Sequence, residues 1–150
     1  MRIVAQRVKM AKVSLGGEKV SEINNGLLIL VGIGKDDSEE DLKYLSRKVV
    51  TLRIFEDDKG KMNLDIGQVR GSILSVPQFT LFADTGKGNR PGFEMSAGPQ
   101  AAKKLWEEFN KMLVNCGADV KEGVFGSHME VELVNDGPVT ILLDSKGSHV

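Results

Sequence analysis

The chain contains very few of the side chains that build disulfides and metal centres. Its 150 residues include one cysteine and two histidines. A single cysteine excludes an internal disulfide, and Cys116, near the end of an apolar helical stripe, is expected to be a buried small hydrophobe. A zinc site needs several clustered ligands, but His128 and His149 are the only histidines and the cysteine lies elsewhere. We therefore expect no metal.

Long apolar runs are also absent. The longest, residues 27–33, is far too short to span a bilayer, and the N-terminal residues lack the apolar block of a secretory signal. The sequence thus predicts a cytoplasmic protein without a membrane partner. A chain of this length with 41% apolar and 27% charged residues is expected to form one domain, residues 1–150.

Neither sign of charge is in excess. Twenty basic and 21 acidic side chains leave a net charge of −1, so the chain lacks the general positive field with which proteins bind nucleic acid non-specifically. Any nucleic acid must then be held by local cations, and we expect no DNA partner. Lys87 and Arg90 lie in a glycine-rich segment, residues 83–96, which is predicted to be an exposed loop. They are either solvated cations or contacts to phosphates.

The common catalytic motifs are missing as well. Gly32, Gly34 and Lys35 resemble part of a phosphate loop but lack the Walker A spacing, so no nucleotide cofactor, and no other cofactor, is expected. Ser75 does not lie in the Gly-x-Ser-x-Gly elbow of serine esterases. A serine esterase that pairs Ser75 with His128 stays open as a weaker alternative.

Periodicity predicts two helices. The first begins at Ser38, an N-cap followed by acidic residues, and ends at about residue 50. The second extends from Gly98 to Cys116, with Gly117 placed for its C-cap and Trp106 at the border of its apolar face. That face is expected to carry Ala102, Leu105, Phe109, Met112 and Cys116.

Alternating and continuous apolar runs predict many strands. They fall at residues 2–8, 12–15, 19–23, 27–33, 53–56, 72–76, 120–125, 129–134 and 139–143. The predicted fold is therefore of the α/β class, in its α+β form. It is a single domain with a strand-rich, largely antiparallel sheet layer or barrel-like core packed by two main helices.

A glycine-proline pair, Gly137-Pro138, separates the last two predicted strands. Proline cannot donate to a strand ladder, so the backbone leaves the sheet here. Two interpretations stay open at this stage. The pair forms an ordinary hairpin turn, or it aims backbone carbonyls outward as recognition groups.

Two segments together resemble a known family. Residues 77–81 (PQFTL) and 135–140 (NDGPVT) match, in order and spacing, the two signature segments of the D-aminoacyl-tRNA deacylases. The similarity covers the whole chain. Further matching segments are residues 6–8, 52–57, 60–64 and 88–93.

The resemblance implies an activity and a selectivity. Members of this family hydrolyse the ester that joins a D-amino acid to the 3′-terminal adenosine of tRNA, and they work as homodimers. A Gly-cisPro segment, here Gly137-Pro138, enters the partner's active site, holds the substrate amino group and leaves no room for an L side chain. Achiral glycine escapes this filter, so glycyl-tRNA is also an expected substrate.

The resemblance also assigns roles near the other segment. The N–H of Phe79 and neighbouring amides would form an oxyanion hole, and a ribose hydroxyl of the tRNA would help to activate water. Gln78 and Thr80 would line or orient the pocket, with Thr80 the one expected to touch the substrate. Arg7 would hold the Gly-Pro segment through backbone carbonyls, although an arginine at a strand edge is usually a solvated cation.

One residue departs from the family pattern. Many members carry serine directly before the Gln-Phe-Thr-Leu segment, whereas this chain has Pro77. A seryl mechanism at that position is excluded. We expect activity to survive, because the proposed donors follow Pro77, but a catalytically silent homodimeric tRNA-binding module is the alternative.

Overall fold

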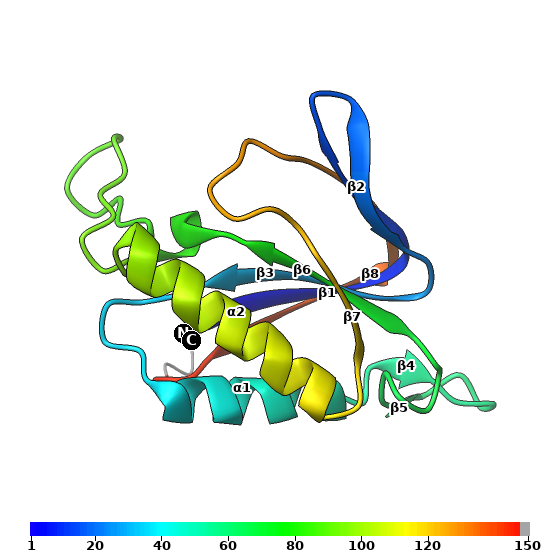
Figure 1. Cartoon of the computed structure of the whole chain (residues 1–150). Helices are drawn as coiled ribbons and strands as arrows, with labels where there is room; N and C mark the ends of the chain where they lie inside the picture. Colours follow the sequence, from blue (N-terminus) through cyan, green and yellow to red (C-terminus); the bar gives the residue numbers. More distant parts are fainter. Residues whose placement is uncertain (148–150) are drawn as a thin grey trace.

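A six-stranded mixed sheet forms the centre of the fold (Figure 1). The structure is a computed structural model that describes residues 1–147, so His149 lies outside the described residues. The sheet order is β2 (Glu18–Ile23), β1 (Arg2–Leu15), β3 (Gly26–Gly32), β6 (Ser72–Pro77) and β7 (Asp119–Glu122), and β8 (Glu130–Asp144) also pairs with β1. A separate small sheet joins β4 (Phe55–Glu56) to β5 (Met62–Leu64).

Strand direction divides the main sheet into two parts. β1 is antiparallel to β2, β3 and β8, whereas β3–β6 and β6–β7 are parallel pairs. The carboxyl ends of β3 and β6 therefore meet at one edge of the sheet. In sheets of this kind that edge is a common place for ligands.

β1 is one long strand, although the sequence predicted two. Residues 2–8 pair with β3, residues 11–15 pair with β2, and β8 follows the strand along most of its length. The exchange of partners occurs where the apolar alternation is interrupted, which is why the pattern suggested a break. A strand shared in this way curls the sheet toward a barrel.

The two predicted helices are present. α1 (Glu39–Thr51) begins with a capping box in which Asp41 accepts from the Ser38 backbone N–H at 2.8 Å. α2 (Pro99–Asn115) has proline in its first turn and ends before Gly117, whose φ of 92° requires glycine. A short 3₁₀ turn, η1 (Phe79–Phe82), follows β6 directly.

The sheet separates two apolar cores. On one face, Leu27 and Ile29 of β3 pack in a cluster with residues of α1 and α2. In Figure 1, α2 crosses in front of the strands and α1 lies below them. On the other face, Leu28 joins a cluster built from β1, β2 and β6. Because both faces of β3 are covered, its sequence is a continuous apolar run instead of an alternating one.

The buried face of α2 differs from the predicted one. Trp106 is 3% exposed and belongs to the helical core, whereas Cys116 is exposed. The prediction that Cys116 is a buried hydrophobe was wrong, because the buried face follows Ala102, Trp106, Phe109 and Leu113 and has turned away from the last residue. The predicted helical spacing of the apolar residues was correct, but the buried face is rotated about the helix axis relative to the predicted one.

The predicted fold class is confirmed, with a sheet that is mixed and nearly barrel-shaped. Among residues 1–147, no helix is both long enough and apolar enough to cross a membrane.

Candidate functional site

A cavity of about 760 Å³ lies at the carboxyl ends of β3 and β6. Its wall combines these strand ends with the beginning of η1, the first turn of α2 and residues 125–129. Most of the lining side chains are apolar, as in pockets that hold small organic groups. Gln78 and His128 are among the few polar ones.

The segment after β6 supplies one wall of this cavity. Pro77, Gln78 and Phe79 all line it, whereas Thr80 does not. β6 tolerates proline at its last position because β7 pairs only with residues 72–75, so no partner on that side needs the missing N–H. Thr80 is instead held by Gln78, whose side-chain Nε2 donates to the Thr80 hydroxyl oxygen.

Two backbone donors at the start of η1 are unpaired. The first N–H groups of a 3₁₀ turn have no acceptor within the turn. Among residues 1–147, the N–H groups of Phe79 and Thr80 also donate to no acceptor elsewhere, whereas Leu81 donates to the Gln78 carbonyl at 3.3 Å. Free donors beside a cavity can stabilise negative charge that develops on a bound carbonyl oxygen.

An aromatic pair lies at the cavity wall. The Phe79 ring, 55% exposed, meets the Phe93 ring edge-on at a centroid distance of 4.9 Å. Phe93 directly follows a loop closed by paired backbone bonds of 2.8 Å between Asp84 and Gly92. This closure brings the loop with Lys87 and Arg90 to the side of the cavity. Neither cation forms an ion pair with any residue in 1–147.

Ser75 is inaccessible. Its side chain is 0% exposed, and its hydroxyl oxygen accepts from Trp106 Nε1 at 3.0 Å. His128 lines the cavity, but no serine hydroxyl within residues 1–147 is hydrogen bonded to it. The serine esterase alternative therefore lacks its nucleophile, because a buried hydroxyl packed against an indole cannot reach a substrate.

Gly137-Pro138 lies in a wide bulge of β8. Gln6 pairs with Thr140 and Val8 with Asn135, so residues 136–139 of β8 stand against the single residue Arg7 of β1. The peptide bond is cis, and both residues are exposed. β8 is antiparallel to β1 both before and after the bulge, so the chain does not reverse direction there. This excludes the hairpin-turn interpretation.

Arg7 is buried beneath the bulge. Its side chain is 6% exposed, Nε donates to the Asp136 carbonyl at 2.8 Å, and Nη1 donates to the Ile54 carbonyl at 2.6 Å. The carboxylates of Glu56 and Asp136 lie 3.8 and 3.7 Å from the guanidinium. Arg7 is therefore not a solvated cation, and it binds the carbonyl directly before Gly137.

Asn135 holds the other end of the bulge. Its Oδ1 accepts from the Val139 N–H at 2.7 Å, and its Nδ2 donates to the Val139 carbonyl at 3.2 Å. The bulge is thus fixed at both ends while Gly137 and Pro138 face outward. Neither residue lines the cavity of its own chain.

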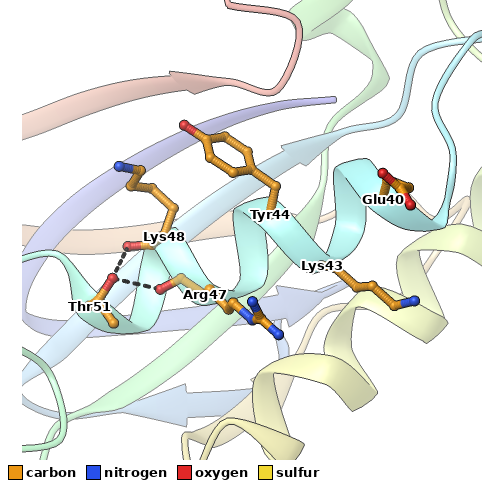
Figure 2. Close-up of a pocket in the computed structure, with 6 residues that line it drawn as sticks. All are labelled: Glu40, Lys43, Tyr44, Arg47, Lys48 and Thr51. Carbon is orange, nitrogen blue, oxygen red and sulfur yellow. Dashed lines mark hydrogen bonds between the residues drawn. The ribbon is translucent and has the colours of Figure 1, made fainter.

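A second hollow, of about 450 Å³, lies on the outer surface of α1 (Figure 2). All its lining residues come from this one helix, and two of its cations have local partners. Lys43 pairs with Glu39 at 2.7 Å, and Lys48 lies 5.7 Å from the centre of the Tyr44 ring. The Thr51 hydroxyl donates to the backbone carbonyls of Arg47 and Lys48 instead of to a side-chain base, so the hollow is not the candidate active site.

Residues 1–147 contain no group of three or more histidine, cysteine, aspartate or glutamate side chains arranged to hold a metal ion. The cavity is an apolar chamber, and among the two unpaired N–H groups it is that of Phe79 that belongs to a lining residue. Fold and cavity thus define a class of α+β proteins with an apolar pocket at the carboxyl ends of two parallel strands.

The comparisons identify the family. The model of the family described as D-Tyr-tRNA(Tyr) deacylase matches residues 4–144. A protein of Thermosipho africanus (strain TCF52B) named D-aminoacyl-tRNA deacylase is 56% identical over 146 residues, which are 97% of this chain and 98% of that protein. The chain therefore belongs to the D-Tyr-tRNA(Tyr) deacylase family, and the predicted enzyme class is confirmed.

Two solved structures share the fold. One, named c-Myc DNA Unwinding Element Binding Protein, is 38% identical with a TM-score of 0.91, over 96% of this chain and 98% of that one. The other, described as a probable eukaryotic D-amino acid tRNA deacylase, is 17% identical with a TM-score of 0.81, over 95% and 97% of the two chains. The second likeness is evidence for the fold alone.

Sequence reasoning missed several residues of the cavity. Phe125 and Met129 line it from the segment after β7, and Trp106 lines it from α2. No local pattern distinguishes these apolar side chains from ordinary core residues. Phe93 was the exception, because it ends one of the segments that match the family.

Proposed function

We propose that the protein hydrolyses the ester between a D-amino acid and the 3′-terminal adenosine of tRNA, and that glycyl-tRNA is also a substrate. The products are free tRNA and the free amino acid. The observation that carries this proposal is the pair of unpaired N–H groups at Phe79 and Thr80, beside a cavity large enough for an aminoacyl-adenosine end.

The chemistry needs no side-chain nucleophile. A water molecule adds to the ester carbonyl carbon while the carbonyl electron pair moves to its oxygen, where the N–H groups of Phe79 and Thr80 stabilise the charge. The carbon–oxygen bond to the ribose then breaks, and the ribose oxygen takes a proton. A neighbouring ribose hydroxyl assists the water. One positioned donor of this kind contributes about 3 kcal/mol to transition-state stabilisation.

Gln78 and Thr80 keep the start of η1 in one arrangement. The Gln78 N–H donates to the Val31 carbonyl at 2.8 Å, which ties the residue to the end of β3. The side-chain bond from Gln78 to Thr80 adds a second link. Both donors of the oxyanion hole lie after Pro77, so the proline removes none of them.

Selectivity requires a second subunit. Gly137 and Pro138 are exposed and lie outside the cavity of their own chain, so they reach an active site only in a homodimer. Val134 and Leu142, which flank the bulge, are 48% and 57% exposed. Apolar side chains beside an outward-facing segment support burial against a partner.

In the homodimer the bulge acts as a chiral filter. Carbonyl groups of Gly137 and Pro138 from one subunit hold the substrate amino group in the cavity of the other. A D side chain then points into open space, whereas an L side chain meets the bulge backbone. Discrimination of this kind arises from a clash with the wrong substrate.

The oxyanion donor can be removed by a single substitution. Phe79→Pro deletes the N–H, and proline suits the first position of a helical turn after a non-helical residue such as Gln78, with φ of −146° and ψ of 79°. Phe79→Ala removes the ring and keeps the N–H. With D-tyrosyl-tRNA, we expect kcat of Phe79→Pro to be about 100-fold below that of Phe79→Ala. Equal kcat values would exclude this N–H from the reaction.

The substrate range tests the filter. Purified protein incubated with D-tyrosyl-, L-tyrosyl- and glycyl-tRNA should release tyrosine from the D form and glycine from glycyl-tRNA, and leave the L form intact. Release is measured as loss of acid-precipitable labelled amino acid. Equal release from the D and L forms would contradict chiral exclusion, and release from neither would favour the silent binding module.

Lys87 and Arg90 are proposed to contact tRNA phosphates near the acceptor end. Both are exposed on the closed loop beside Phe93, and neither is neutralised by a carboxylate within residues 1–147. A local pair of cations fits a chain whose net charge is −1.

The salt dependence of tRNA binding tests these contacts. In Lys87→Gln/Arg90→Gln, the slope of log K against log salt should fall by about 1 to 2, because each lost phosphate contact lowers it by just under one. Arg47→Gln/Lys48→Gln on α1 (Figure 2) is the charge-matched control and should leave the slope unchanged. A change in the control alone would place the tRNA on α1. Duplex DNA as competitor tests the prediction that DNA is not a partner.

A further inference from the structure

The η1 turn rests on the end of β3 because glycine occupies two positions there. A Cβ atom at Gly32 would lie 3.0 Å from the Gln78 carbonyl oxygen and 3.0 Å from the Leu81 Cβ. At Gly34 it would lie 2.9 Å from the Phe82 ring. The turn is therefore packed directly against the chain at the end of β3, where the bond from the Gln78 N–H to the Val31 carbonyl fastens its start.

A charged side chain holds the end of the turn. Arg2 Nη1 donates to the Leu81 carbonyl at 3.0 Å, and the guanidinium lies 4.7 Å from the centre of the Phe82 ring. Its Nε also pairs with Asp144 Oδ2 at 3.1 Å. Arg2 lies on β1, where its register partners are Gly32 at the end of β3 and Asp144 at the end of β8.

These contacts bear on the donors at the start of the same turn. η1 has four residues, and its backbone bonds include the long one of 3.3 Å from Leu81 to Gln78. A turn this short depends on outside support for its orientation. Arg2 gives that support at Leu81 and Phe82, the two residues that follow Phe79 and Thr80, through a planar group that can bond and stack at once.

We propose that Arg2 is a positioning residue, which holds η1 so that the N–H groups of Phe79 and Thr80 point into the cavity. The inference rests on the proposed function for its effect on rate. The competing explanation is that Arg2 only fastens β1 to β8 through Asp144.

A matched ion pair separates the two explanations. Lys12 and Glu132 join the same two strands at 2.9 Å, and within residues 1–147 Lys12 forms no hydrogen bond or ion pair with η1. Lys12→Met therefore removes a fastening between β1 and β8 without touching the turn, whereas Arg2→Met removes both. Arg2→Lys keeps the charge but cannot span Leu81, Phe82 and Asp144 together.

The experiment measures kcat and KM with D-tyrosyl-tRNA, and the ¹⁵N order parameters of the η1 amides. In Arg2→Met we expect kcat to fall about 10- to 100-fold with KM within about twofold, because a displaced donor mainly affects the transition state. Order parameters over residues 79–82 should fall below about 0.6, from about 0.85. Arg2→Lys should lie between Arg2→Met and the unaltered protein, and Lys12→Met should change neither quantity.

The inference is overturned if Arg2→Met and Lys12→Met have the same kcat and the same order parameters in η1. If Arg2→Met does not fold, Arg2→Lys decides: unchanged kcat and order parameters would equally overturn the inference. If the unaltered protein does not release D-tyrosine, the proposed function fails. The order parameters of the variants then still show whether Arg2 holds the turn.

Discussion

The buried guanidinium of Arg7 is the interaction on which the shape of β8 depends. It binds the carbonyls of Asp136 and Ile54 where four residues of β8 stand against one of β1. A buried charge is tolerated only when its donors are satisfied, so this arginine and the bulge require each other. Because of the bulge, β8 continues to pair with β1 on both sides of it while Gly137 and Pro138 leave the sheet.

The proposed reaction site depends on another residue of β1, the strand that carries Arg7. The parallel pair β3–β6 brings two strand ends to one edge, and η1 begins there with its free N–H groups. Arg2 at the start of β1 contacts η1, and Arg7 further along contacts the bulge. β1 therefore carries the supports of both the proposed catalytic segment and the proposed selective segment.

Much of the fold could be predicted from local pattern, and little of this long-range support could. The capping box at Ser38 and the end of α2 at Gly117 are determined by neighbouring residues. In contrast, Arg2 finds its partners 79 and 142 residues away, and Arg7 finds one 129 residues away, so both read as ordinary surface cations in the sequence. The resemblance supplied Arg7 and Phe79, but nothing in the sequence indicated Arg2.

In the proposed homodimer, the bulge of one subunit completes the cavity of the other. Heterodimers purified through two different tags would combine a Phe79→Pro chain with a chain lacking residues 137–138, a deletion that preserves the alternation of β8. Only the second chain then has a working oxyanion hole, and only its partner has the bulge. We expect release from D-tyrosyl-tRNA and none from L-tyrosyl-tRNA, whereas release from the L form would show that each chain uses its own bulge.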